Sequence, residues 1–255
     1  MKRLVWVVLV GAGAVAAQPA GDARRSGFDF MSASTQAMQA DDMQNPGMLW
    51  VAEGAALWQR KEGRSDRSCA DCHEAGTAPA MRGVAARYPA FDTPSRQPVN
   101  LQQRINLCRE RRQQAAALPL ESRELLSLES RVAHQSRGLP ISPPTDERLR
   151  PFRALGQALY EQRIGQLHLS CRQCHDEHAG QRLGGSTLPQ AHPTGYPVYR
   201  LEWQGMGSLQ RRLRGCMTGV RAEPFPYGAQ ELVALELYLA ARAAGMRIET
   251  PAVRP

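Results

Sequence analysis

Two short stretches of this sequence, Cys69-Ala-Asp-Cys72-His73 and Cys171-Arg-Gln-Cys174-His175, share the pattern Cys-x-x-Cys-His. The pattern is typical of covalent attachment of a c-type haem, because two thiols one helical turn apart add to its vinyl groups and the histidine ligates the iron. The alternatives are a zinc site and a redox-active cysteine pair. A zinc site lacks an evident rule for pairing its ligands, and a redox motif does not explain the histidine after both copies. The sequence therefore predicts two covalently bound haem c groups, attached through Cys69, Cys72, Cys171 and Cys174, with His73 and His175 as axial ligands.

The two motifs lie in a tandem duplication of the chain. Gly54 and Gly156 each precede the first cysteine of their own motif by 15 residues. A Tyr-Pro pair precedes Cys108 by 20 residues, and another precedes Cys216 by the same interval. The repeat period is therefore 102 to 108 residues, and the stretch 138–151, which contains four prolines, links the two halves.

We predict a mainly α-helical protein made of two tandem cytochrome c-type domains related by internal duplication, with an N-terminal extension. Helical periodicity is clearest after Glu231, where Leu232, Leu235 and Leu239 share one face. Each half has few apolar residues, so a covalently held haem would supply much of its core. The expected segments are 1–17 (signal peptide), 18–47 (N-terminal extension), 48–140 (domain 1, haem 1) and 152–255 (domain 2, haem 2 and active site).

The N-terminus has the features of a secretory signal. Lys2 and Arg3 form a charged start, residues 4–15 are apolar, and Ala16 and Ala17 are small residues suited to cleavage. The apolar run is shorter than the roughly 20 residues that span a bilayer, which argues against a membrane anchor. No other stretch is long and apolar enough to span. We expect an exported, periplasmic protein with no membrane span after signal removal.

The basic composition is weak evidence for a nucleic-acid partner. The formal net charge is +8, but Lys2 and Arg3 leave with the signal, and the propionates of two haems would bring the total near neutrality. No basic run is interleaved with aromatic residues, as nucleic-acid binding would suggest. We expect local positive patches and no nucleic-acid binding.

Cys108 and Cys216 lie outside the motifs, one in each half. Their matched positions in the repeat favour a role as the distal axial ligand of the haem in the same half, where a thiolate would favour ferric iron and lower the reduction potential. A disulfide between them is the alternative. Other possible distal ligands, none with a counterpart in the other half, are Met81, Met206, Met217, His168, His178 and His192.

The surroundings of Cys216 differ from those of Cys108. Gly215 and Gly219 flank Cys216, and because glycine permits tight turns and close backbone approach, the sulfur is expected at the bottom of a cleft. Arg212 lies four residues earlier, on the same side of a helix. Four arginines lie near Cys216 in the sequence and would lower the pKa of its thiol and attract anions; the alternative for each of them is a solvent-exposed surface position. They are Arg211, Arg212, Arg214 and Arg221.

The sequence resembles the dihaem SoxA cytochromes of sulfur-oxidising bacteria. The features that carry the resemblance are the two haem motifs, the extra cysteine in each half, and Gly215-Cys216-Met217 followed by Arg221-Ala222-Glu223-Pro224. The resemblance covers essentially the whole mature chain. It implies a heterodimer with the monohaem cytochrome SoxX. It also implies oxidative coupling of thiosulfate to a cysteine of SoxY in the SoxYZ carrier, with two electrons passing through SoxX to a cytochrome c.

The resemblance also implies residue roles. Cys216 would be the catalytic residue of an L-cysteine S-thiosulfotransferase, ligating haem 2 and carrying an extra sulfur as a persulfide. Arg212 would bind thiosulfate, and Cys108 would be the distal ligand of haem 1. Two other functions compete with this one. A dihaem electron-transfer cytochrome needs no cationic cleft, and a dihaem peroxidase needs an open or displaceable ligand position.

Overall fold

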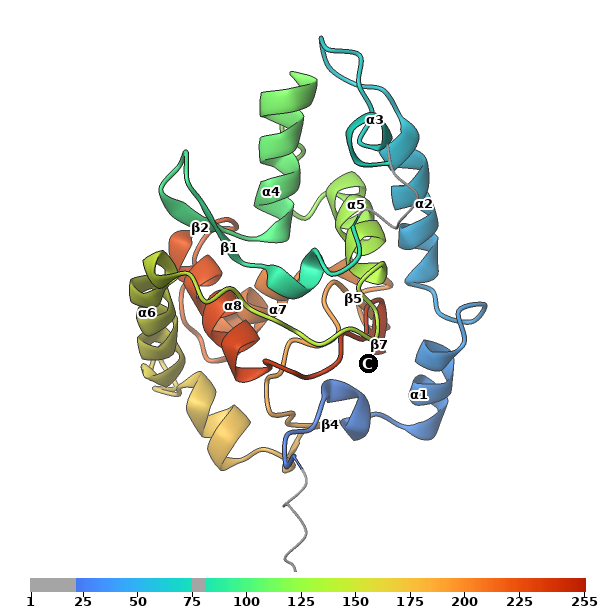
Figure 1. The fold of residues 1–255 in the computed structure, drawn as a ribbon. Helices are drawn as coiled ribbons and strands as arrows, with labels where there is room; N and C mark the ends of the chain where they lie inside the picture. The colour runs from blue at the N-terminus through green and yellow to red at the C-terminus, as the bar shows by residue number, and fades with distance from the viewer. Residues whose placement is uncertain (1–21, 75–80) are drawn as a thin grey trace, which may run out of the picture.

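The computed structural model describes residues 22–74 and 81–255, so the predicted signal peptide lies outside the described residues. Helices dominate this part of the chain, as predicted (Figure 1). Among the described residues, no helix combines the length and apolar character that crossing a membrane requires.

The first half contains α1 (Ala33–Ala40), α2 (Met48–Gln59), α3 (Ala70–His73), β1 (Ala90–Asp92), β2 (Gln97–Val99), α4 (Leu101–Cys108) and α5 (Arg123–His134). The second half contains α6 (Arg150–Glu161), β3 (Arg182–Leu183), β4 (Ser186–Thr187), β5 (Val198–Arg200), β6 (Gly205–Gly207), α7 (Leu209–Gly219), α8 (Gln230–Arg242) and β7 (Ala252–Arg254). The short 3-10 turns are Gly27–Phe30, Ala85–Arg87 and Glu147–Leu149, and π-helical turns occupy Arg109–Gln113 and Gln173–Glu177.

The duplication is visible in how helices pack. The most extensive helix contacts join α2 to α5 and α6 to α8. A Cβ atom at Gly54 would lie 2.0 Å from the carbonyl oxygen of Ser127, and one at Gly156 would lie 2.0 Å from that of Ala234. The two glycines paired by the sequence are therefore the points where the helix backbones touch in each half.

Each half also carries an antiparallel hairpin before its cysteine-bearing helix. β1 pairs with β2 and β5 pairs with β6, and a cis Tyr-Pro bond precedes each hairpin. Side chains of Asn100 and Ser208 then cap the first turns of α4 and α7, accepting a backbone hydrogen bond from the third helical residue. Because the same hairpin and helix cap precede both helices, Cys108 and Cys216 lie at equivalent points on α4 and α7.

The N-terminal segment and the C-terminal strand pack together on the second half (Figure 1). Gln39 of α1 accepts a hydrogen bond from the Val253 amide at 3.0 Å, and Asn45 donates to the Pro251 carbonyl at 2.8 Å. β7 runs parallel to β5 and extends the hairpin to three strands. Sequence patterning predicts neither element, because the buried residues of α1 are the polar Thr35 and Gln39 and β7 is only three residues long.

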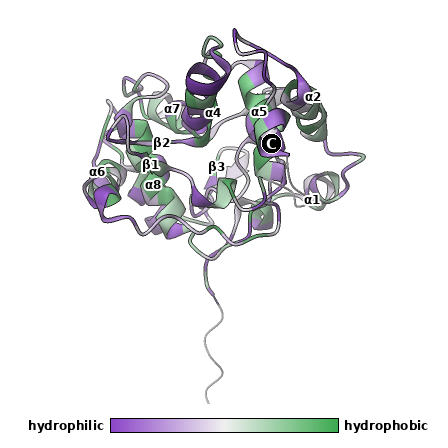
Figure 2. Cartoon of the chain, turned by 45° about the horizontal axis from the view of Figure 1, so that its top comes forward, coloured by the Kyte–Doolittle hydropathy of each residue, from purple (hydrophilic) through white to green (hydrophobic). Residues whose placement is uncertain are grey.

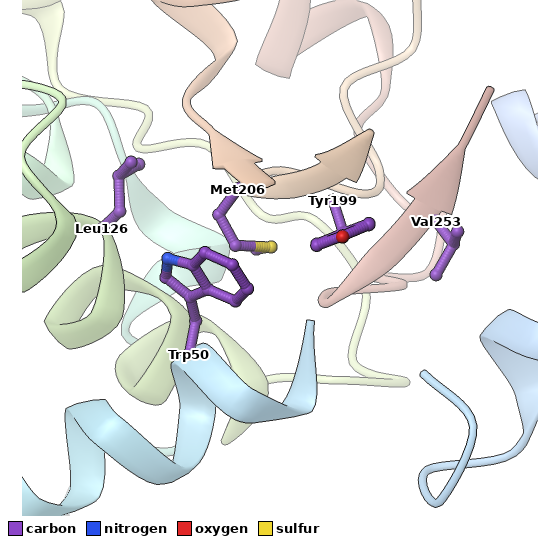
Figure 3. Packing of buried hydrophobic residues seen from close by; sticks show 5 residues of the cluster. All are labelled: Trp50, Leu126, Tyr199, Met206 and Val253. Atoms are coloured by element: carbon purple, nitrogen blue, oxygen red, sulfur yellow. The ribbon is translucent and has the colours of Figure 1, made fainter. Parts of the chain in front are cut away.

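A shared apolar cluster joins the two halves (Figure 3). The Trp50 and Tyr199 rings meet edge-on with centroids 5.7 Å apart. Figure 2 shows apolar residues on α2, α5 and α8, with hydrophilic residues at the outer end of α4. The cluster therefore fixes the halves against each other, and its members are Trp50, Leu126, Tyr199, Met206 and Val253.

Two glutamates at equivalent positions, Glu129 and Glu236, line a cavity of about 100 Å³ between the halves. Gln102 donates to Glu129 at 2.7 Å, and Asn100 donates to Glu236 at 3.4 Å. Glu236 is buried, and its second carboxyl oxygen has no hydrogen-bond partner among the described residues. Burial raises the pKa of Glu236 to about 8.

Replacing Gly156 with alanine should destabilise the haem-loaded protein by about 2 kcal/mol, since overpacking costs about 1–3 kcal/mol and outweighs the gain in helix propensity. Urea unfolding followed by circular dichroism measures this. Ala158→Ser on the exposed side of the same helix is the control. Equal midpoints for both variants would contradict a tight contact at Gly156.

Replacing Glu236 with glutamine should remove a pH-dependent loss of stability. Because the folded-state pKa of Glu236 is about 8, above its unfolded value, the carboxyl stabilises the fold at low pH and loses that contribution as pH rises toward 8. The variant should therefore gain stability relative to wild type at pH 8.5 but not at pH 5, measured as urea midpoints. Glu124→Gln on exposed α5 surface is the control, and equal pH profiles would contradict the prediction.

Candidate haem and thiol site

The second Cys-x-x-Cys-His motif folds into consecutive helical turns. Ser170 and Gln173 cap its start, with the Gln173 amide donating to Ser170 Oγ at 3.2 Å and the Ser170 amide donating to Gln173 Oε1 at 3.0 Å. This cap holds the thiols of Cys171 and Cys174 one turn apart. His175 Nδ1 donates to the Pro189 carbonyl at 2.7 Å, which leaves Nε2 to face a metal.

Cys216 on α7 faces this histidine. Both residues line one cavity of about 430 Å³, and they lie close enough for the His175 ring to lower the pKa of the Cys216 thiol. Apolar side chains of Leu209, Leu213 and Leu239 form part of its wall. A nitrogen donor and a sulfur donor thus face each other in an apolar cavity beside two free thiols, which fits a covalently attached haem c.

All six cysteines are free, so the structure does not form the alternative Cys108–Cys216 disulfide. The other candidate distal ligands lie in different surroundings, and Met81 belongs to the apolar cluster beside the first haem motif. Met81, Met206 and Met217 are buried in the hydrophobic clusters, and His168 and His178 are exposed. His192 alone among them lines the same cavity as His175, and it has no counterpart in the first half.

The glycines beside Cys216 do not form the expected tight turn. Gly215 and Gly219 both lie within α7, and among the described atoms nothing comes within 4 Å of a Cβ built at either position. The predicted close backbone approach is therefore wrong. The expectation of a sulfur in a cleft agrees with the structure, because Cys216 is half-buried and lines the cavity.

The arginines near Cys216 in the sequence differ in where their side chains lie. Arg212 lines the cavity, whereas Arg211 lies over the Trp203 ring at 4.2 Å and Arg214 lies over the Tyr227 ring at 4.4 Å. Arg221 follows α7 in the left-handed region, with φ of 59°. Of the four arginines that the sequence grouped around Cys216, only Arg212 faces the cavity.

Arg200 is a functional candidate that sequence reasoning missed. It lies at the end of β5 and lines the same cavity as Arg212 and Cys216. Burial alone would raise the pKa of the Cys216 thiol, but the His175 ring and the charges of Arg212 and Arg200 outweigh burial and hold the pKa below its usual value. The thiol is therefore biased toward the thiolate.

The first half contains the same set of donors. Cys69 directly precedes α3, which carries Cys72 and His73, and the centroid of the His73 ring lies 5.5 Å from that of the Trp58 ring. Burial raises the pKa of the Cys108 thiol, opposite to the shift at its counterpart. An apolar cluster surrounds this region and fits a haem, with buried members Trp58, Met81, Leu101, Leu128 and Val132.

Comparison with known proteins identifies the family. The family model for the SoxA/TsdA cytochrome c domain matches residues 53–141 and 155–248, one segment in each half. The chain belongs to the SoxA family. The L-cysteine S-thiosulfotransferase subunit SoxA of Pseudaminobacter salicylatoxidans is 38% identical over 94% of this chain and 85% of that protein. The SoxA subunit of Rhodovulum sulfidophilum is 36% identical over 91% of this chain and 81% of that protein.

A solved SoxA-containing structure has the same fold. The crystal structure of SoxXA from P. pantotrophus matches with a TM-score of 0.86 and 33% identity, covering 91% of this chain and 87% of that chain. The predicted family and the mainly helical tandem cytochrome c fold are confirmed. Cytochrome c domains of this family imply covalently bound haem c. The roles of individual site residues stay predictions that the geometry supports.

Replacing the distal cysteines one at a time should separate the two haems spectroscopically. Cys108→Ala and Cys216→Ala should each remove one low-spin ferric thiolate signal from the electron paramagnetic resonance spectrum, because each would delete one sulfur ligand. Intact mass should still show two attached haems, since the attachment thiols are untouched. A histidine–methionine or bis-histidine signal at haem 2 in the wild type would contradict ligation by Cys216.

Proposed function

We propose that this protein is the catalytic SoxA subunit of a thiosulfate-oxidising L-cysteine S-thiosulfotransferase. The observation that carries the proposal is the meeting of His175, Cys216 and Arg212 at one cavity that has an apolar wall and several arginines, with the pKa of the Cys216 thiol held below its usual value. The curated relatives that match most of the chain are named as this subunit. The substrate would be thiosulfate together with a cysteine of the SoxY carrier in SoxYZ.

The overall reaction balances as an oxidative coupling. The carrier thiolate and thiosulfate form one sulfur–sulfur bond, giving a cysteine S-thiosulfonate and releasing two electrons; a carrier thiol also releases its proton. A bound haem c would supply the acceptor for the electrons. Arg212 holds the thiosulfate dianion by a charge-assisted hydrogen bond, and the apolar wall around it strengthens that interaction.

Cys216 would present a polarisable sulfur beside the anion and carry an extra sulfur as a persulfide. We assign Cys69, Cys72, His73 and Cys108 to haem 1, and Cys171, Cys174, His175 and Cys216 to haem 2. Since Arg104, the arginine one turn before Cys108, is already paired with Asp92, we assign haem 1 a structural or ancillary role.

The proposal includes the partners and the compartment. SoxX, a monohaem cytochrome, would form the heterodimer and pass electrons to a cytochrome c; a matching solved structure is the SoxXA complex of P. pantotrophus. The predicted signal peptide places the complex in the periplasm. A dihaem electron-transfer cytochrome without sulfur chemistry is the alternative, but it would not require a cation and a low-pKa thiol in one cavity.

Cys216→Ser should abolish thiosulfate-dependent reduction of cytochrome c in the presence of SoxX and SoxYZ, because serine offers no sulfur. Arg212→Gln should raise the KM for thiosulfate about tenfold or more, as loss of a charge-assisted hydrogen bond implies. Stopped-flow absorbance measures both.

The control for these variants is Arg163→Gln, which alters an exposed arginine outside the cavity and should behave as wild type. Wild-type turnover by Cys216→Ser would remove this residue from the reaction. An inactive wild-type complex would contradict the proposed function and favour the electron-transfer alternative.

A further inference from the structure

The two halves differ in charge at one equivalent position. Asp92 is the last residue of β1 and pairs across its hairpin with Gln97; Arg200 is the last residue of β5 and pairs with Gly205. Both follow a cis Tyr-Pro bond by the same interval, and both hairpins lead into the helix that carries the free cysteine. At this equivalent position the first half therefore has an acidic residue and the second half a basic one.

In the first half, the acid neutralises the arginine next to the cysteine. The Asp92 side chain is 1% exposed and lies 3.0 Å from Arg104, which precedes Cys108 by four residues. Both amino groups of Arg111 also donate to Asp92, each at 3.1 Å. Hydrogen bonds from Arg111 hold the pKa of Asp92 well below its usual range. Arg104 therefore has an internal counterion.

In the second half, the equivalent arginine has no such counterion. Within the described chain, no carboxylate forms an ion pair with Arg212, and the cavity lining contains arginines but no aspartate or glutamate. Gly219 stands three residues after Cys216, where the first half has Arg111 three residues after Cys108. The side chains that would reproduce the closed network of the first half are absent.

Arg200 is held in place by Pro255, which lines the cavity, and by Glu202 and Trp203, which do not. Its Nε donates to the Pro255 carbonyl at 2.8 Å, and one amino group lies 3.0 Å from Glu202, whose side chain is 53% exposed. The guanidinium also lies 5.0 Å from the Trp203 ring. The Arg200 side chain is only 12% exposed, so its position is defined and its charge is poorly screened by solvent.

We propose that Arg200 is a second thiosulfate-binding residue, acting with Arg212, and that the change from Asp92 to Arg200 restricts anion binding to the second half. Of the other arginines that line the cavity, Arg254 is paired with Glu249 and Arg182 is exposed, so Arg200 and Arg212 are the two cations that match the two negative charges of thiosulfate. The first-half network already contains its own anion. That the bound anion is thiosulfate rests on the proposed function. It adds a residue that lies 16 positions from Cys216 and reaches it only through the fold.

The test compares Arg200→Gln, Arg200→Asp and Arg200→Lys in the complete complex. Arg200→Gln should raise both the KM and the calorimetric Kd for thiosulfate about tenfold, with a smaller change in kcat, because one charge-assisted contact is lost. Arg200→Asp should be worse, since it recreates the acid–arginine pair of the first half. Arg200→Lys should recover most of the binding because it keeps the charge.

Ionic strength supplies a readout that a purely structural role would not move. Binding of a dianion by two cations weakens with added salt, so Arg200→Gln should show a shallower salt dependence of Kd than wild type. Arg211→Gln is the matched control, because Arg211 stacks on the same Trp203 ring but does not line the cavity. Its Kd and salt dependence should equal those of wild type.

Three outcomes separate the possibilities. An active wild-type complex whose thiosulfate Kd and salt dependence are the same in Arg200→Gln as in Arg211→Gln overturns the role of Arg200. An unchanged Kd with a lowered haem content or altered haem 2 spectrum also overturns it, since Arg200 would then hold a haem propionate. Thiosulfate binding that depends on Arg200 without any turnover would support this inference while contradicting the proposed function.

Discussion

Contact between helix backbones at two glycines determines the frame on which both halves are built. Gly54 against Ser127 and Gly156 against Ala234 bring α2 onto α5 and α6 onto α8 at a separation that no side chain at the glycine would allow. α5 and α8 then support the cysteine-bearing helices α4 and α7. The helix backbones approach equally closely in both halves. The motif histidine and the free cysteine therefore occupy equivalent positions in the two halves.

The shared frame does not give the halves the same chemistry. Backbone position is conserved between Asp92 and Arg200, yet the charge at that position is inverted. One half therefore contains a closed acid–base network around its cysteine helix. The other places Arg200 and Arg212 beside a thiol with a lowered pKa, and among the described residues the half-exposed Glu202 is the only acidic side chain that forms an ion pair with either arginine. Function here is determined by a few side chains on a duplicated scaffold, rather than by the scaffold itself.

Sequence reasoning predicted the parts of the structure whose signals are local or periodic. The haem motifs have fixed spacing, the paired glycines recur at one offset, and Leu232, Leu235 and Leu239 mark α8 by their period. β7 has no such signal, because three residues become a strand only by pairing with β5. Arg200 was missed for the same reason, since a hairpin and not a helical turn brings it to Cys216. Gly215 and Gly219 were misread because glycine next to a reactive cysteine resembles a turn, while the capped α7 continues through both.

The closeness of Arg200 to Arg212 also affects the stability of the fold. Burial opposes the charge of Arg200 and lowers its pKa, and the nearby Arg212 lowers it further, so the second half keeps a destabilising arrangement that Asp92 removes from the first. Arg212 has no carboxylate partner among the described residues, and a ligand anion would complete its pairing. This incompletely neutralised pair of arginines lies beside the thiol with the lowered pKa, which is where a functional site is expected. A bound dianion would therefore restore in the second half the charge balance that the first half has built in.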